Sequence, residues 1–187
     1  MDYTALYNEL NIILGDSDNF TFTPEEKQRA LKQAINDRYV VKPAMGTFTY
    51  SSSTRGYTLP SGINTVRNLQ YSSDSDWPRS LPGDSYEVID GTIYMDYDYR
   101  YDIPDGATIT VLGNDKLTIT DTISSTNLQE YILTLAHFTT LSLLGTKKTN
   151  RFIKNDTNMS EIIALRRELQ QNILQQRQSL ARSYERA

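Results

Sequence analysis

The stretch Leu128–Leu144, with the sequence LQEYILTLAHFTTLSLL, is the most apolar part of this chain. Drawn as a helix, it carries apolar side chains on most of its sides, and such a helix needs other elements to cover it. Gly145 marks its end, and Lys147 and Lys148 follow where positive charge favours the negative end of the helix dipole. The stretch therefore predicts a buried central helix.

The residues after this helix predict a second, longer one over 159–184, on the order of 37 Å in length. Asn158 and Glu161 have the spacing of a capping box at its start. Its apolar stripe thins toward the end, where glutamines dominate, so the helix outruns a core of this size. The far half is expected either to project into solvent or to lie on a neighbouring subunit. The stripe consists of Ile162, Leu165, Leu169, Ile173 and Leu180.

Two short amphipathic helices are expected at the start of the chain. The first carries apolar residues at offsets of three and four from Tyr3 to Leu14 and stops at Gly15. The second opens at Thr23, which is followed by Pro24 and, three residues after the cap, by Glu26, a capping box with proline at the first helical position. It should end near Arg38–Tyr39, because β-branched residues and then a proline follow. A short loop between the two predicts an antiparallel pair.

Residues 46–123 change to short β-prone runs separated by turn sequences. Asp90-Gly91 between two alternating runs predicts a hairpin over 88–95. The expected fold class is therefore α+β: a bundle of about four helices from residues 1–45 and 124–187, with a β-rich insertion at 46–123 and a long C-terminal helix. The roughly six strands are expected at 47–50, 56–59, 65–69, 86–89, 92–95 and 107–112.

Composition narrows the functional class. The apolar share of 38% is low for a globular domain, while tyrosine is abundant at 13 of 187 residues, which fits surfaces that become half-buried against partners. Cysteine is absent, which excludes disulfides and thiolate chemistry. No apolar run is long enough to span a membrane, and Met1-Asp2-Tyr3-Thr4 does not begin a secretory signal. Assembly in a cytoplasm is expected.

The net charge of −4 is spread unevenly along the chain. Residues 71–130 hold 12 acidic and 3 basic side chains, a net of −9, whereas residues 147–187 hold 4 acidic and 9 basic ones, a net of +5. Opposite charges at separate places permit head-to-tail contact between copies, because complementary potentials orient encounters. The alternative is that both segments simply face water.

The residues for catalysis are scarce. His137 is the only histidine and lies within the most apolar helix, where a lone histidine is more often a structural residue than a catalyst. Zinc sites lack ligands, no nucleophile elbow is present, and the glycines are spaced as turns rather than as a phosphate loop. The C-terminal arginines alternate with glutamates in an acidic chain, opposite to the usual nucleic-acid footprint. We expect no enzyme, no metal and no cofactor.

A run of alternating aspartates is the remaining candidate for a site. If residues 94–102 form a strand, Asp96, Asp98 and Asp102 share one face and tyrosines the other. Clustered carboxylates can bind calcium or act as an acid–base pair, but the calcium-loop pattern fails here for lack of a glycine and a terminal glutamate. A solvated acidic face over a tyrosine-packed one is the favoured interpretation.

The order of these parts resembles the head–tail adaptor, or connector, proteins of tailed bacteriophages, over nearly the whole chain. Two N-terminal helices, a β insertion with a Tyr-x-Leu-Pro element, a buried helix and a long polar C-terminal helix carry the resemblance. The matching residues are Phe22-Thr23-Pro24-Glu25-Glu26, Tyr57-Thr58-Leu59-Pro60-Ser61-Gly62 with Val66, Tyr86-Glu87-Val88 with Ile93-Tyr94, Ile103-Pro104-Asp105-Gly106, and Tyr131-Ile132.

The resemblance implies a structural protein of the virion neck, in a homo-oligomeric ring, usually of twelve copies, that joins the portal to the tail and continues the DNA channel. DNA would pass without sequence-specific binding, and Asp96, Asp98 and Asp102 would face the lumen or the tail, where like charge keeps DNA off the wall. The C-terminal helix would be the portal-facing arm. Its candidate portal or subunit contacts are Arg166, Arg167, Gln171, Gln175, Arg177, Arg182 and Arg186.

Two other interpretations stay open. One is a different neck or tail-completion protein, which shares the structural class but differs in position. The other is a carbohydrate- or ligand-binding module that uses the tyrosine-rich insertion as a stacking surface. A ring subunit predicts concentration-dependent oligomers. A binding module predicts a monomer with exposed tyrosines.

Overall fold

Helices and antiparallel strands both occur in the computed structural model, which describes residues 1–72, 78–96, 103–144 and 156–186, with only the backbone described at 156–159 and 183–186. Two antiparallel sheets accompany the helices, so the expectation of a mixed α+β fold is confirmed. The elements of the described ranges are α1 (Tyr3–Leu14), α2 (Pro24–Ile35), β1 (Val41–Thr49), β2 (Gly56–Thr58), β3 (Thr65–Ser72), β4 (Arg79–Ser80), β5 (Tyr86–Ile89), β6 (Thr92–Met95), β7 (Thr108–Lys116), α3 (Thr126–Leu144) and α4 (Asp156–Arg186).

The ends of the first two helices follow from their capping residues. Asp2 caps α1 by accepting a 2.8 Å hydrogen bond from the Ala5 N–H, and Gly15 ends it with a φ of 60°. The capping box of α2 is formed in full, with Thr23 and Glu26 each accepting from the other's backbone N–H. The capping box expected at Asn158 is wrong, because the backbone is already helical from Asp156.

The chain divides into two units, which we call the helical unit (1–40 and 117–187) and the β unit (41–116). The expected boundaries lay a few residues further along, at 45/46 and 123/124. The first boundary moves because β1 begins at Val41, where β-branched residues already form strand rather than ending a helix. Helix α2 ends at Ile35, three residues before the expected end.

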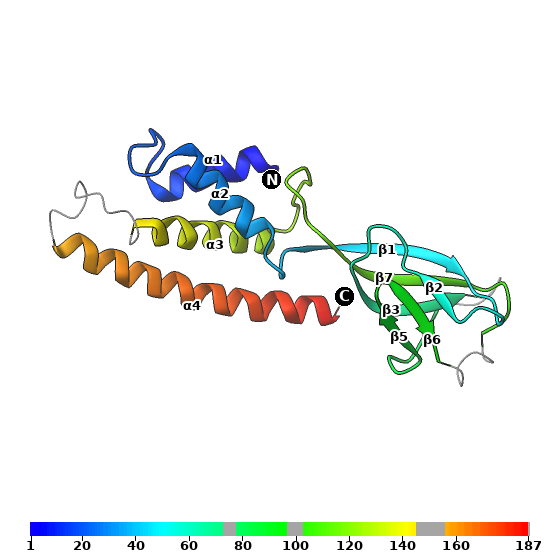
Figure 1. Ribbon diagram of the computed structural model, residues 1–187. Coiled ribbons are helices and arrows are strands. Elements are labelled where there is room, and N and C mark those ends of the chain that lie inside the picture. The colour runs from blue at the N-terminus through cyan, green and yellow to red at the C-terminus, as the bar shows by residue number, and fades with distance from the viewer. Residues whose placement is uncertain (73–77, 97–102, 145–155, 187) are drawn as a thin grey trace. The chain divides into compact units, whose positions relative to one another are not determined.

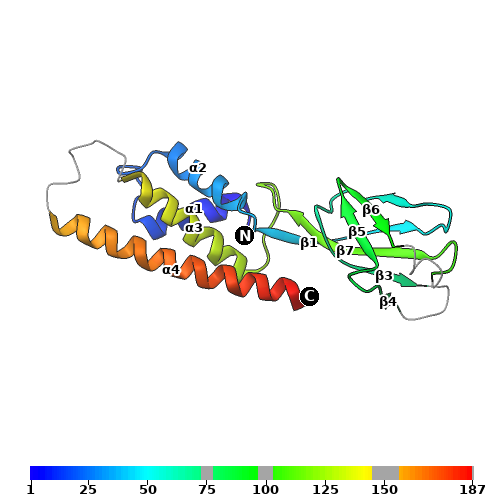
Figure 2. The ribbon, with the colours of Figure 1, turned by 60° about the horizontal axis from the view of Figure 1, so that its bottom comes forward.

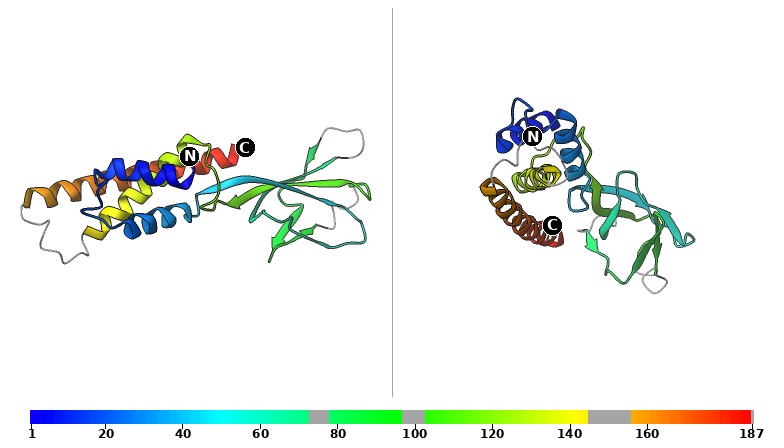
Figure 3. Two further views of the ribbon diagram at one scale, coloured as in Figure 1. Left: turned by 90° about the horizontal axis from the view of Figure 1, so that it is seen from above. Right: turned by 60° about the vertical axis from the view of Figure 1, so that its left-hand side comes forward.

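Helix α3 is the centre of the helical unit. In Figures 1 and 3 it lies between α1 and α2 on one side and α4 on the other. Tyr131, Ile132 and Ala136 on α3 are fully buried, and they share one core with Leu10, Leu31 and Ile173 from the other three helices. Each buried aliphatic side chain of this kind contributes about 1.5–3 kcal/mol of transfer free energy. The helical unit is therefore stabilised mainly by the packing of the other three helices against α3.

The β unit consists of two antiparallel sheets over one core, as Figure 2 shows. The larger sheet has the order β1-β7-β3-β4 and the smaller one β2-β6-β5. Leu69 and Ile109 from the first sheet and Ile93 from the second are fully buried in that core. The predicted hairpin at Asp90-Gly91 joins β5 to β6, with both turn residues at positive φ. Strand β4 was not expected, and it completes seven strands in the described ranges.

The loop between α1 and α2 is organised by a buried ion pair. The Lys27 ammonium lies 2.9 Å from the Asp16 carboxylate, with both side chains almost completely buried. Lys27 also donates to the Asn11 and Asn19 side chains and to the Asp16 carbonyl oxygen, while Asp16 accepts from the N–H groups of Thr21 and Phe22. Every donor of the ammonium is thus used, as a buried charge requires.

Candidate functional site

Helix α4 presents one covered face and a wide exposed one. Leu169, Ile173 and Leu180 of the expected stripe are buried against the rest of the helical unit, whereas Leu165 of the same stripe is exposed. On a neighbouring side of the helix, Ile163 is 45% exposed and Leu174 52% exposed. Eleven residues make about three helical turns, so these two aliphatic side chains lie on the same flank, with Arg167 between them. We call Ile163, Arg167 and Leu174 the apolar flank of α4.

A second exposed flank of α4 is polar. Gln171, Gln175 and Arg182 are all exposed. Gln175 follows Gln171 by 4 residues and Arg182 follows it by 11, and these spacings put the three side chains on one line along the helix. We call these three residues the polar flank of α4. Three of the seven candidate contacts predicted on this helix therefore form one continuous polar strip, and Arg167 lies beside it.

Two of the predicted contact residues are held within the helical unit instead. The Arg177 guanidinium donates to the Tyr131 hydroxyl at 2.8 Å and to Asp37 at 3.0 Å. The Arg166 guanidinium carbon lies 5.7 Å from the centroid of the Phe138 ring, a cation–π contact. Their role as free partner contacts was overestimated, since sequence spacing alone does not show which long side chains fold back on the core. The Arg186 side chain lies outside the described residues.

The acidic run of the β unit is described only at its start. Asp96 is exposed directly after β6, and its backbone N–H donates to the Ser85 carbonyl oxygen at 2.7 Å. Asp98 and Asp102 lie outside the described residues. The acidic face therefore stays a prediction beyond Asp96.

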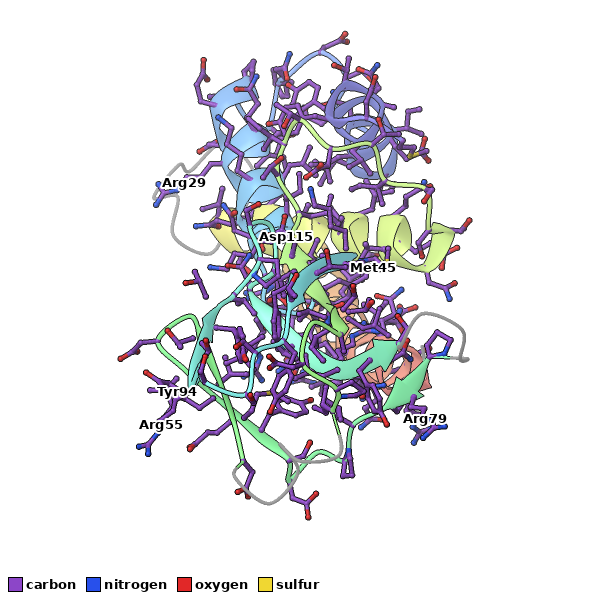
Figure 4. All side chains as sticks on the ribbon, turned by 90° about the vertical axis from the view of Figure 1, so that its right-hand side faces the viewer. Arg29, Met45, Arg55, Arg79, Tyr94 and Asp115 are labelled. Atoms are coloured by element: carbon purple, nitrogen blue, oxygen red, sulfur yellow. The ribbon has the colours of Figure 1, made fainter. Side chains whose placement is uncertain are left out.

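Among the described tyrosines of the β unit, Tyr50, Tyr57, Tyr71 and Tyr86 belong to its core or pack against it. Tyr50 and Tyr57 are buried, and the Tyr57 ring stacks on Phe48 with centroids 4.3 Å apart. Tyr94, labelled in Figure 4, is 43% exposed on β6, and its ring covers Gly56 on the paired strand. Arg55, next to Gly56 and also labelled there, is exposed. One exposed tyrosine beside an arginine is the aromatic surface that these described strands offer.

The histidine and the acidic side chains of the described residues were candidates for a metal site. His137 is half-buried on α3, and burial lowers its pKa, so it is neutral at pH 7. Within the described ranges, no group of three or more histidine, aspartate or glutamate side chains has the geometry to hold a metal ion. In the same ranges, no helix combines the length and apolar character needed to cross a bilayer.

A second exposed surface was missed at the sequence level. Ile13 was placed in the core stripe of α1, yet it is 41% exposed, and its neighbour Ile12 is 67% exposed. Phe20, in the following loop, is 79% exposed. Glu9 lies one turn before Ile12 and Ile13 on α1. We call Glu9, Ile12, Ile13 and Phe20 the α1 surface. The sequence feature that could have drawn attention to this segment is the absence of any basic residue before Lys27.

No protein-family model matches this chain, and no curated protein matches it at a significant level.

Proposed function

We propose that this chain is a structural subunit of a tailed-phage neck, a head–tail adaptor that forms a ring between the portal and the tail. The observation that carries the proposal is the exposed side of α4, a 31-residue helix with aliphatic side chains left on its apolar flank. Exposed apolar surface rimmed by polar residues marks protein–protein contact sites, and Ile163, Leu165 and Leu174 all remain exposed on this helix. Such a surface is expected of a subunit whose exposed apolar side chains are covered by neighbouring subunits.

The proposed position of this chain in the virion comes from the resemblance seen in its sequence. The Tyr-x-Leu-Pro element forms a compact corner of the β unit: the Tyr57 hydroxyl donates to the Ser51 carbonyl oxygen, the Leu59 N–H donates to the Gly91 carbonyl oxygen, and Pro60 packs on Gly46. These contacts give the motif a structural reason, since each of its residues has a specific partner. The resemblance therefore rests on residues that build the fold rather than on scattered identities.

The polar flank of α4 is the proposed portal contact. Gln171, Gln175 and Arg182 offer side-chain amides and a guanidinium in a continuous strip, which suits a polar and partly acidic partner surface. Arg177 is left out of this contact because its guanidinium donates to Tyr131 and Asp37 within the helical unit. Asp96 would face the DNA channel or the tail side, where negative charge limits adhesion of DNA.

The two alternative functions are not equally well supported. Another neck or tail-completion protein would use the same surfaces at another position, and only the identity of the bound partner separates it from an adaptor. The ligand-binding module is less favoured, because Tyr50 and Tyr57 are buried in the core of the β unit and leave less aromatic surface for stacking.

Portal binding tests the proposal directly. The purified chain, mixed with the portal protein encoded near it, should form a larger complex in size-exclusion chromatography with light scattering. Changing Gln171→Glu, Gln175→Glu and Arg182→Glu together should weaken that complex roughly tenfold or more, because carboxylates replace the donors of the polar flank.

A matched control carries the same three kinds of change on the exposed face of α2: Gln28→Glu, Gln33→Glu and Arg29→Glu. Its charge change is identical, so a general electrostatic effect would appear in both variants. The adaptor proposal is contradicted by a chain that remains a monomer and does not bind the portal. Equal losses in both variants would remove the portal contact from the polar flank.

A further inference from the structure

The α1 surface combines apolar side chains with negative charge. Ile12 and Phe20 are among the most exposed large apolar residues of the chain, and Ile13 lies next to them. Residues 1–26 hold six acidic side chains and no basic one, and Asp16 of these forms the buried ion pair with Lys27. A partner for this surface has to offer apolar contact together with positive charge.

The apolar flank of α4 offers this combination. Ile163 and Leu174 are the exposed aliphatic residues, and Arg167 lies on the same flank between them. The exposed Arg167 gives this flank a positive charge, whereas Glu9 gives the α1 surface a negative one. The two surfaces are thus complementary in charge and alike in their apolar content.

Their positions in the helical unit permit contact between copies. The α1 surface and the apolar flank of α4 belong to elements on opposite sides of α3 (Figures 1 and 3). They also lie at similar levels along the helices, because Leu14 at the end of α1 and Leu169 on α4 pack in the same small cluster with Leu141. Neighbouring copies related by a rotation about an axis along the helices would bring one surface against the other.

We infer that the α1 surface of one copy packs against the apolar flank of α4 on the next copy. This inference rests on the proposed ring and names the contact that closes it. The contact is heterologous, because the two surfaces differ, and heterologous contacts generate rings when the rotation closes. An isologous dimer through either surface would place like charges together, which is unfavourable.

Two single variants test this pairing. Ile12→Glu disables the α1 surface, and Leu174→Glu disables the flank of α4, each at an exposed position where the fold should tolerate the change. Circular dichroism and thermal melting of each variant should match those of the unmodified chain. In analytical ultracentrifugation each variant alone should lose the larger oligomers, with a dissociation constant raised about tenfold or more.

Mixing the two variants gives the sharper result. Each still has one intact surface, so the mixture should form dimers through one native contact and stop there, because the remaining contact would join two modified surfaces. Ile119→Glu is the matched control, since Ile119 is 46% exposed in the helical unit but belongs to neither surface. It should assemble like the unmodified chain.

The outcomes separate this inference from the proposed function. If the unmodified chain forms rings, alone or on the portal, and both variants do so equally well, the pairing of these surfaces is wrong while the adaptor function stands. A mixture that stays monomeric while each variant alone is also monomeric overturns the heterologous pairing. An unmodified chain that assembles neither alone nor on the portal overturns both.

Discussion

Arg177 on α4 donates a 2.8 Å hydrogen bond from Nε to the hydroxyl of Tyr131 on α3. The hydroxyl in turn donates to Asp37 Oδ1 at 2.9 Å, and the Arg177 guanidinium closes the triangle to Asp37 Oδ2 at 3.0 Å. Burial, together with Asp37, raises the pKa of Tyr131 to about 12 against the opposing effect of Arg177. The hydroxyl therefore stays protonated and keeps its role as a donor.

This triangle predicts a stability effect of Arg177 that an exposed arginine lacks. Arg177→Met should lower the free energy of unfolding by about 1–3 kcal/mol, because Tyr131 and Asp37 lose a partner in a partly buried site. Arg29→Met, the same change at an exposed position of α2 outside both proposed contact surfaces, should stay within about 0.5 kcal/mol. Urea denaturation followed by circular dichroism measures both. Similar losses in the two variants would show that the triangle contributes nothing specific.

The buried pair of Asp16 and Lys27 predicts a larger effect. Lys27→Met removes the ammonium and leaves a carboxylate in the interior, which should cost about 3–5 kcal/mol. Lys32→Met provides the control on the exposed side of the same helix. Thermal and urea unfolding of the two variants should differ clearly. A mild effect of Lys27→Met would mean that water reaches Asp16 when the ammonium is gone.

Acid should destabilise the helical unit in two steps. Burial lowers the pKa of His137 from 6.5, so folding favours the neutral ring, and the contribution of His137 is complete above about pH 6.5 and decreases below it. Burial alone would raise the pKa of Asp16, but the hydrogen bonds from Thr21, Lys27 and Phe22 outweigh it and lower the value from 3.8 to about 2. Its contribution, about 2 kcal/mol, is complete above about pH 4 and lost toward pH 2.

Urea unfolding across this pH range checks both signs. Asp16→Asn should flatten the step between pH 4 and 2, and His137→Gln should flatten the one that begins below 6.5. The observation that would refute this account is a stability that rises on acidification through either window. Each variant serves as the control for the other, because Asp16 lies in the loop between α1 and α2 whereas His137 lies on α3.

Much of the fold could be predicted because its signals are local. The Thr23–Glu26 capping box, the Gly15 stop and the Asp90-Gly91 turn each act within a few residues, and each is formed as expected. The first strand was expected only from residue 47, but β1 begins at Val41 and includes Pro43. The proline is accommodated because β1 is an edge strand, where a missing N–H leaves no ladder bond unmade on the open side.

The candidate site was predicted less well, because its geometry depends on distant residues. Asp37, Tyr131 and Arg177 meet although 94 and 46 positions separate them along the chain. Periodicity placed Arg177 on a polar helix face but carries no information about which residues converge there. Ile13 likewise fits the apolar stripe of α1 by its spacing, yet it is 41% exposed.

Gly113 provides a prediction for the β unit, where the sequence indicated a turn but the structure places it inside β7. It lies opposite Val66, at the register shift between Val66 and Asn68 in the paired strand. A Cβ added there would meet the carbonyl oxygen of Thr65, a backbone atom, and would lie 2.7 Å from the Ile63 side chain. Gly113→Ala should therefore destabilise the chain by about 1–3 kcal/mol, as overpacking does.

Gly83→Ala is the matched control for that substitution, because no atom lies within 4 Å of its added Cβ and its φ is ordinary. This variant should be neutral or slightly more stable, since alanine reduces the freedom of the unfolded chain. Unfolding of both variants, followed by near-ultraviolet circular dichroism of the tyrosines in the β unit, separates the two effects. If Gly113→Ala leaves the stability unchanged, β3 shifts away from β7 at the bulge without loss of packing. The close approach of Thr65 to Gly113 is then not required for the register of these two strands.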